Sequence, residues 1–242
     1  MEIVDWDRVK AATLEAANLY SLTLAVFDAV LREPELATGA LVLTKGGPCL
    51  LTARHVINRF LQLGSQGRLQ IGRDGYVFSS IPVERISLGR RIDIASIRLT
   101  IKEAEETGQP MLTWSDIRLD YVEEGTLVAF VGYPGSWKRQ QPTGSIGIGS
   151  YEFFGFVQTV ELDQFSVRVD EGQDFVFKTN PESRAFEGFS DLGGLSGAPI
   201  FQAADRPKVI GIVSEGGLWS QREQKIYGVH VSALDSDGSV RA

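Results

Sequence analysis

The spacing of hydrophobic residues predicts one helix near the start of the chain. Over residues 5–19, the positions that recur at helical intervals run from Trp6 to Tyr20. Asp5 and Asp7 lie at the beginning of this stretch, where carboxylates favour the start of a helix. The face it presents consists mostly of small side chains. We therefore expect this helix to pack on a barrel rather than to form a core of its own.

From Tyr20 onward, short apolar segments alternate with Gly, Pro or Asp turns, which is the pattern of an all-β protein. The candidate strands form a first series at 22–31, 40–44, 49–52, 68–71, 76–78, 83–88 and 94–99, and a second at 125–132, 153–162, 164–169, 175–178, 198–202, 209–214 and 226–231. Residues 100–113 between the two series are less apolar and form either a connection or a short helical turn. Glycine is abundant, at 26 of 242 residues, which agrees with many turns.

Two series of strands predict an all-β fold of two packed six-stranded antiparallel barrels. We divide the chain into an N-terminal helical extension, residues 1–19, and one domain over residues 20–235. The first barrel covers about residues 20–108 and the second about residues 109–235.

The composition argues against several classes of protein. The chain carries 24 basic and 31 acidic residues, a net charge of −7, whereas nucleic-acid binding needs a concentrated basic face. No apolar run approaches the roughly 18 residues that span a bilayer, and the first residues lack the basic and apolar regions of a signal peptide. We therefore expect a cytoplasmic protein that binds neither nucleic acid nor membrane.

The cysteine and histidine content argues against a metal site. Cys49 is the only cysteine, which excludes internal disulfides and a zinc site built on thiolates. His55 and His230 are the only histidines. We expect Cys49 to be buried and inert, and His230 to be a strand histidine whose ring is satisfied by its neighbours. No metal and no cofactor are predicted.

Three short stretches of the sequence carry candidate catalytic residues. The first contains a histidine and the second contains an aspartate. Residues 50–56 run from a strand through a small-residue turn to His55, at the start of a predicted helix over 55–61. Asp93 is flanked by isoleucines, and a carboxylate so placed needs a strong donor to stay ionised. Taken alone, His55 is equally compatible with a structural histidine at the end of an element. An isolated Asp93 more commonly caps a strand or turn.

The third stretch surrounds Ser196 with glycines, over residues 192–200. Glycines let the backbone turn sharply and direct N–H groups at one point, as an oxyanion beside a nucleophile requires. Taken alone, the stretch is also compatible with a hairpin loop. Together the three stretches supply the base, orienting acid and nucleophile of a triad in the order His55, Asp93, Ser196.

At these residues the chain resembles the chymotrypsin/trypsin-like serine peptidases. The matching pieces are Thr52-Ala53-Arg54-His55, Asp93-Ile94-Ala95 and Gly194-Leu195-Ser196-Gly197-Ala198-Pro199, with softer matches at 132–134 and 211–216. Their order and spacing suit the family, and the resemblance spans about residues 20–235. It implies a serine endopeptidase that acts on a polypeptide substrate.

The resemblance implies a role for each matched residue. Ser196 attacks the scissile carbonyl, while His55 takes its proton and later delivers it to the leaving amine. Asp93 holds the imidazole in the productive tautomer. The backbone N–H groups of Gly194 and Ser196 form the oxyanion hole.

The resemblance also implies where substrate binds. Ser190 would lie at the base of the primary specificity pocket. Ser214, Glu215 and Gly216 would pair with the extended backbone of the substrate, a form of strand addition.

Two residues depart from the family pattern. Leu195 occupies the position at which cleavage-activated members carry an Asp that pairs with the newly cut N-terminus. A leucine cannot accept this ion pair, so the site is either always formed or ordered by a ligand or an activating protein partner. Arg54 is bulkier than the usual small residue, and we expect it either to face solvent or to contact substrate at the rim.

Other functions remain open from the sequence. A latent or catalytically silent member would serve as a binding or regulatory module, although degenerate members commonly lose the serine or histidine that this chain keeps. An esterase with the same triad is a narrower alternative.

Overall fold

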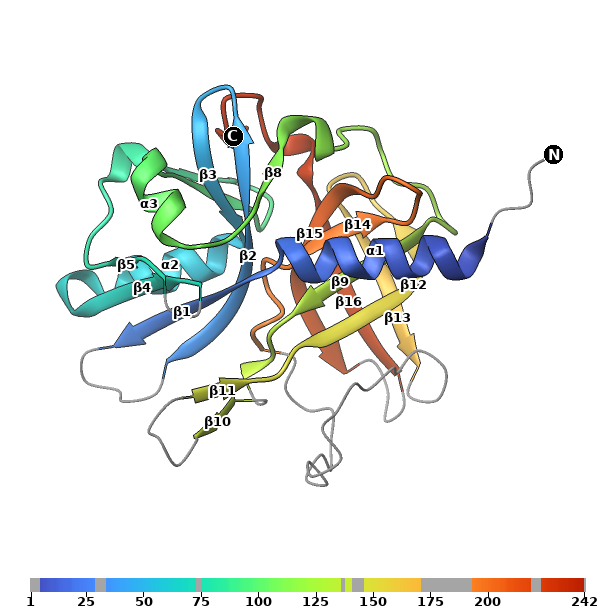
Figure 1. The fold of residues 1–242 in the computed structure, drawn as a ribbon, viewed down its shortest axis with the longest axis horizontal. Helices are drawn as coiled ribbons and strands as arrows, with labels where there is room; N and C mark the ends of the chain where they lie inside the picture. The colour runs from blue at the N-terminus through green and yellow to red at the C-terminus, as the bar shows by residue number, and fades with distance from the viewer. Residues whose placement is uncertain are drawn as a thin grey trace.

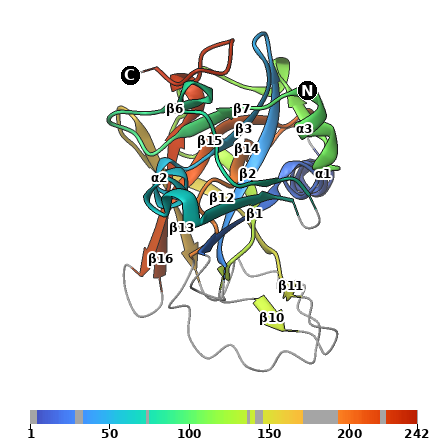
Figure 2. The ribbon, with the colours of Figure 1, turned by 90° about the vertical axis from the view of Figure 1, so that its left-hand side faces the viewer.

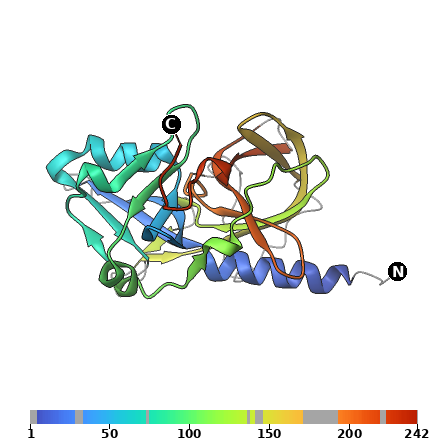
Figure 3. The same cartoon turned by 90° about the horizontal axis from the view of Figure 1, so that it is seen from above.

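Two β-sheets, one from each half of the chain, lie side by side, and a long helix runs along the second of them (Figure 1, Figure 3). The computed structural model describes residues 5–28, 34–72, 75–135, 138–140, 146–170, 193–218 and 223–241. The predicted all-β class with an N-terminal helix is confirmed.

The first sheet is formed by β1 (Leu22–Asp28), β2 (Glu35–Thr44), β3 (Gly47–Thr52), β4 (Gly67–Ile71), β5 (Val77–Phe78), β6 (Ile86–Leu88) and β7 (Ala95–Arg98). Its strand order is β5-β4-β1-β2-β3-β7-β6, and all these pairs are antiparallel. A further short strand, β8 (Met111–Thr113), pairs in parallel with β2. The sheet curls as a half-barrel, and its ladder does not close within the described residues.

The second sheet closes into a barrel of six antiparallel strands, as predicted. These are β9 (Leu127–Gly132), β12 (Tyr151–Val160), β13 (Gln164–Asp170), β14 (Pro199–Gln202), β15 (Lys208–Leu218) and β16 (Glu223–His230). The order around the barrel is β12-β13-β16-β15-β14-β9. A separate hairpin joins β10 (Lys138–Gln140) and β11 (Ile146–Ile148). The strand expected at 175–178 lies outside the described residues.

The three helices form where local signals favour them. α1 (Trp6–Tyr20) begins after Asp5, whose side chain accepts a hydrogen bond from the Arg8 N–H. α2 (Arg54–Gln62) follows β3 and packs against β1 and β4 (Figure 2). α3 (Ile101–Glu106) fills part of the connection between the two halves, and its first turn is closed by a capping box. None of the helices in the described part of the chain has the length and apolar character needed to cross a lipid bilayer.

A shared hydrophobic core joins the two halves. Side chains from β2 and β3, such as Val42 and Leu51, pack with Phe201 and Ile212 of the closed barrel. Ala17 of α1 belongs to the same cluster. Each half also has a core of its own. Because close-packed interiors have low compressibility, loops from the two halves that meet at this junction keep a fixed spacing.

Candidate active site

His55 and Asp93 form a hydrogen-bonded pair at one end of the first sheet. His55 lies in the first turn of α2, and Asp93 lies in the loop that leads into β7. One carboxylate oxygen, Oδ2, lies 2.7 Å from His55 Nδ1, and the other, Oδ1, accepts the backbone N–H of His55 at 2.9 Å. Asp93 therefore caps the start of α2 and holds the imidazole ring at the same time. The sequence offered the capping of a strand or a turn as the alternative to holding the imidazole; Asp93 instead caps a helix, and it binds the ring as well.

Arg54 braces the loop that carries Asp93. Its Nη1 atom donates to the carbonyls of Gly89 and Arg90 at 2.7 and 2.8 Å. The loop also closes on itself, because Gly89 N–H donates to the carbonyl of Ile94 at 2.9 Å. Neither expectation for Arg54, a solvent-facing side chain or a contact with substrate, describes these bonds: the guanidinium binds backbone carbonyls of the protein itself.

Ser196 lies in a tight turn that only glycine permits on either side. Gly194 and Gly197 have φ angles of +104° and +91°, values that side chains rarely adopt. A methyl group at Gly197 would lie 2.2 Å from Thr52 Oγ1 and 3.1 Å from the Ala53 nitrogen. The turn therefore lies directly against the segment that leads into His55.

The Ser196 hydroxyl donates to the backbone carbonyl of Ser214, with an oxygen–oxygen distance of 3.3 Å. No hydrogen bond between Ser196 and His55 occurs among the described residues. Transfer of a proton between them would need a rotation about the Ser196 side-chain bond.

Every backbone carbonyl of residues 193–196 accepts a hydrogen bond from the protein. In chain order the donors are the Gly135 N–H, the Thr38 hydroxyl, the Ala198 N–H and the Thr38 N–H, at 2.6, 2.7, 2.9 and 2.9 Å. The C=O and N–H groups of one planar trans peptide point in opposite directions. The N–H groups of Gly194 and Ser196 therefore point away from these donors, and neither is bonded to an acceptor in the described part of the chain. Preoriented N–H groups beside a serine, with no acceptor among the described residues, are what an oxyanion requires.

Leu195 is an apolar anchor for this turn. Its side chain is 1% exposed and belongs to the core of the closed barrel with Phe130 and Ala198. A methyl group at Gly132 would come within 2.7 Å of Leu195 Cδ2, so glycine is the residue that leaves room for the leucine. Burial takes the place that an ion pair holds in cleavage-activated proteases of the resembled family.

The predicted substrate segment lies on β15. Ser214 is buried and its hydroxyl donates to the Tyr227 carbonyl at 3.3 Å, whereas Glu215 is exposed. Gly216 pairs with Ile226 of β16 on one side. On the other side, β14 pairs with β15 only as far as Ile212 in the described chain. Ser190, expected at the base of the specificity pocket, lies outside the described residues.

Sequence reasoning missed Thr38 and Gly135, both of which donate to the serine turn. Thr38 stands within an apolar strand, where a threonine is ordinary. Gly135 adjoins residues 132–134, a weaker match to the family pattern, and this is the only local signal in the sequence that points to Gly135. Both contacts cross between segments distant in the chain, so neither has a signature in its own neighbourhood.

The described arrangement of sheets recurs in solved proteases. A protease of M. tuberculosis, Rv3671c in its active form, matches with a TM-score of 0.52 and 12% identity over 92% of this chain and 80% of that one. AL20, a thermostable serine protease from an extremophilic microorganism, matches with a TM-score of 0.53 and 11% identity over 88% and 91%. Deg5 matches with a TM-score of 0.50 and 11% identity over 96% and 92%.

The fold is that of the chymotrypsin-like proteases. The resemblance predicted from the short motifs is confirmed at the level of the fold by these structural matches. No protein-family profile and no curated protein sequence matches the chain. In this chymotrypsin-like chain, the Ser196 turn lies against Thr52 and Ala53, the residues that lead into His55, and His55 in turn is bonded to Asp93.

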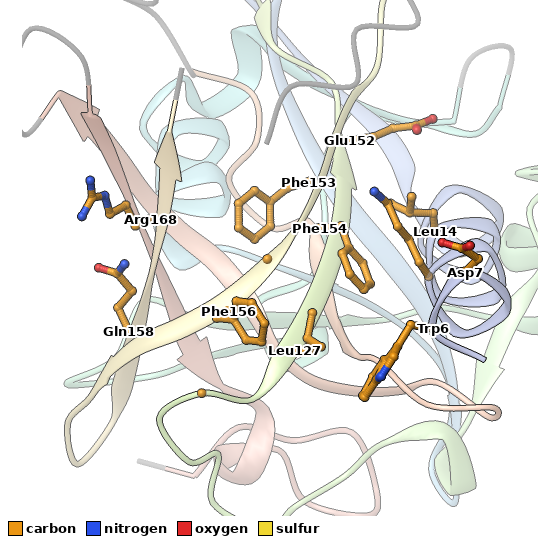
Figure 4. Close-up of a pocket in the computed structure, with 13 residues that line it drawn as sticks. Trp6, Asp7, Leu14, Leu127, Glu152, Phe153, Phe154, Phe156, Gln158 and Arg168 are labelled. Carbon is orange, nitrogen blue, oxygen red and sulfur yellow. The ribbon is translucent and has the colours of Figure 1, made fainter. Parts of the chain in front are cut away.

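A groove of about 780 Å³ lies apart from these three residues, between α1 and the outward-facing side of β12 (Figure 4). Trp6 and Lys10 line one side, and Phe154 and Phe156 the other. The Lys10 ammonium stands over the Phe154 ring, 5.4 Å from its centroid. None of the candidate catalytic residues lines this groove.

Proposed function

We propose that this protein is a serine endopeptidase that hydrolyses peptide bonds through His55, Asp93 and Ser196. The N–H groups of Gly194 and Ser196 would hold the oxyanion. One observation carries the proposal: the glycine-flanked serine turn, whose carbonyls all accept hydrogen bonds from the protein, lies against the segment that leads into the hydrogen-bonded His55–Asp93 pair.

The reaction follows from this geometry. Ser196 Oγ attacks the carbonyl carbon of the scissile bond as its proton passes to His55 Nε2. Asp93, bonded to Nδ1, stabilises the resulting imidazolium. The tetrahedral oxyanion accepts hydrogen bonds from the N–H groups of Gly194 and Ser196. His55 then protonates the leaving amine, the carbon–nitrogen bond breaks, and water releases the acyl group by the same steps.

A polypeptide is the substrate that the strand geometry supports best. Residues 214–216 of β15 continue past the end of the β14 ladder, so in the described part of the chain one backbone edge is left for an added strand. An extended peptide that pairs there would reach Ser196, whose hydroxyl already contacts the Ser214 carbonyl. A small ester would gain nothing from this edge.

One observation favours a second candidate, a latent or regulatory module. Ser196 Oγ is directed at the Ser214 carbonyl and not at His55. If this orientation persists, His55 cannot take the proton, and the chain would bind polypeptides without cleaving them until a partner reorients the serine.

The first test is labelling with a fluorophosphonate probe, read by intact mass. We expect one adduct on the wild type and none on Ser196→Ala. An unlabelled wild type would contradict the peptidase proposal and support the latent module. Cleavage of an unfolded protein such as casein, compared with hydrolysis of p-nitrophenyl acetate, separates a peptidase from an esterase: only a peptidase cleaves both.

A further inference from the structure

We propose that Thr38 is the positioning residue that keeps the oxyanion turn formed, in a chain with no ion pair at Leu195. This inference rests on the proposed function and deepens it: it says how the site is held ready without cleavage of the N-terminus. Thr38 lies in β2, in the half of the molecule opposite Ser196.

The Thr38 hydroxyl has two hydrogen-bond partners, one that donates to it and one that accepts from it, and together they determine where its hydrogen points. The Tyr133 N–H donates to Thr38 Oγ1 at 3.1 Å, so the hydroxyl hydrogen is left to bind the Gly194 carbonyl at 2.7 Å. This bond fixes the peptide that follows Gly194. Because Tyr133 belongs to the same loop as Gly135, the hydroxyl also anchors the loop that holds the Gly193 carbonyl.

The backbone of Thr38 adds two further contacts. Its N–H donates to the Ser196 carbonyl at 2.9 Å, and its carbonyl accepts the Thr52 hydroxyl at 2.7 Å. Thr52 lies three residues before His55 in the chain. One residue therefore contacts both the nucleophile turn and the segment that carries the base.

Burial makes these bonds necessary. Thr38 is fully buried, so water has no access to replace a lost hydroxyl. A buried carbonyl or N–H without a partner is costly. Removing the hydroxyl would leave the Gly194 carbonyl and the Tyr133 N–H unpaired together. The loop of Tyr133 and Gly135, released from the hydroxyl, would no longer hold the Gly193 carbonyl in place. The peptide between Gly193 and Gly194, which carries the Gly194 N–H, would then be free to turn away from the oxyanion position.

The apolar anchor cannot do this alone. Leu195 holds the turn in place by packing, but dispersion contacts do not distinguish one orientation of a neighbouring peptide from its reverse. Hydrogen bonds to the carbonyls do. Leu195 and Thr38 therefore have separate roles: the leucine fixes where the turn lies, and the threonine fixes which way its peptides point.

The test is the kinetics of fluorophosphonate labelling of Thr38→Val, which keeps the shape and removes the hydroxyl. The phosphonyl oxygen must enter the oxyanion hole, so we expect kinact to fall at least about tenfold while KI changes little, since a single oxyanion donor is worth about 100-fold or more. Thr38→Ser should restore most of the rate. The matched control is Thr13→Val, another buried threonine, whose hydroxyl donates to Val9 in α1; it should label as the wild type does.

The outcomes separate this inference from the proposed function. An unlabelled wild type overturns both. A labelled wild type with an unchanged Thr38→Val rate, or a slow Thr38→Val that Thr38→Ser does not rescue, overturns the role of the hydroxyl and leaves the peptidase proposal standing. If Thr38→Val does not fold, Thr38→Ala and Thr38→Ser, which differ only in the hydroxyl, give the same comparison.

Discussion

Asp93 uses its two carboxylate oxygens for different purposes, and this division makes the residue informative. One oxygen accepts the backbone N–H of His55 and the other binds its ring. A carboxylate satisfies both because each oxygen is an acceptor. An amide at the same position has only one acceptor oxygen, so it can accept a hydrogen bond from only one of the two groups.

We therefore expect Asp93→Asn to fold but to lose turnover by about 10⁴-fold, the effect of the same change in the template triad. With the amide oxygen on the backbone N–H, its NH₂ group faces Nδ1. Nδ1 must then accept a hydrogen bond, which places the ring proton on Nε2. Because Nε2 already carries a proton, it cannot take the proton of the Ser196 hydroxyl. The measurement is kcat together with circular dichroism. Near-normal turnover would mean that another acid orients His55.

His230 is the second informative residue. It lies in a strand, as predicted, and it is buried. The expectation that its neighbours satisfy its ring is wrong, because neither ring nitrogen has a hydrogen-bond partner in the described structure. The rings of Phe165 and Tyr121 pack against it at 5.1 and 5.8 Å between centroids. Burial lowers the pKa of His230, and the negative charge of Asp163 opposes this shift only in part.

This lowered pKa predicts acid sensitivity. The unfolded chain takes up a proton on His230 near pH 6.5, whereas the folded chain does so only at lower pH. The free energy of unfolding should therefore fall as the pH drops from about 6.5 toward the lowered pKa of the folded chain. Above about pH 6.5 the contribution of His230 to that free energy is constant. Urea unfolding at pH 7.5 and pH 5.5 tests this: His230→Phe should lose less stability over that interval than the wild type. Equal losses would contradict the assignment.

Among the structural elements, the loop before β7 determines how well the acid is placed. It is short: Ile92 and Ile94 anchor it to the shared core, and hydrogen bonds to its carbonyls hold the rest of its shape. Arg54 supplies two of them from the first turn of α2. The residue beside the histidine thus holds the loop of the aspartate, and both catalytic candidates depend on one guanidinium.

We expect Arg54→Met to lower kcat by about tenfold or less, since bonds from a charged donor contribute roughly 1.5–3 kcal/mol and the loop keeps its remaining contacts. The downfield proton signal of the His55 Nδ1–Asp93 hydrogen bond should broaden or shift at the same time. Arg68→Met is the matched control, because Arg68 Nη1 also binds two carbonyls, those of Ser65 and Gly67, far along the first sheet. An equal loss in both variants would show a general effect on stability.

For the whole molecule, the core that joins the halves holds the site together. Thr38 and His55 come from the first half and Ser196 from the second, so their spacing depends on the packing between the sheets. α1 contributes to that packing through Ala17, which is fully buried. The helix therefore stabilises the site from a distance, as part of the same core.

Ala17→Asp should destabilise the protein by about 3 kcal/mol or more, because it buries an unpaired charge. Ala11→Asp, the same change at an exposed position of the same helix, should be close to neutral. Thermal unfolding of both variants measures the difference. Similar melting temperatures would mean that α1 does not pack on the barrel in solution.

The elements and the motifs can be predicted from the sequence alone, because both depend on neighbours along the chain. Helical spacing with an acidic start located α1, and alternating patterns located most of the strands. The three candidate residues were found because each lies within a recognisable turn: a small-residue turn before His55, isoleucines around Asp93, and glycines around Ser196. Their order along the chain resembles that of the chymotrypsin-like serine peptidases, and this resemblance implies the fold.

The tertiary structure decided what holds those residues in position. Thr38 and Gly194 are 156 residues apart, and Arg54 binds a loop some 35 residues away. A threonine in a strand or an arginine in a helix has the same local pattern whether or not it makes such a bond. Only the tertiary packing shows which carbonyls are held, and therefore which N–H groups of the serine turn have no acceptor among the described residues.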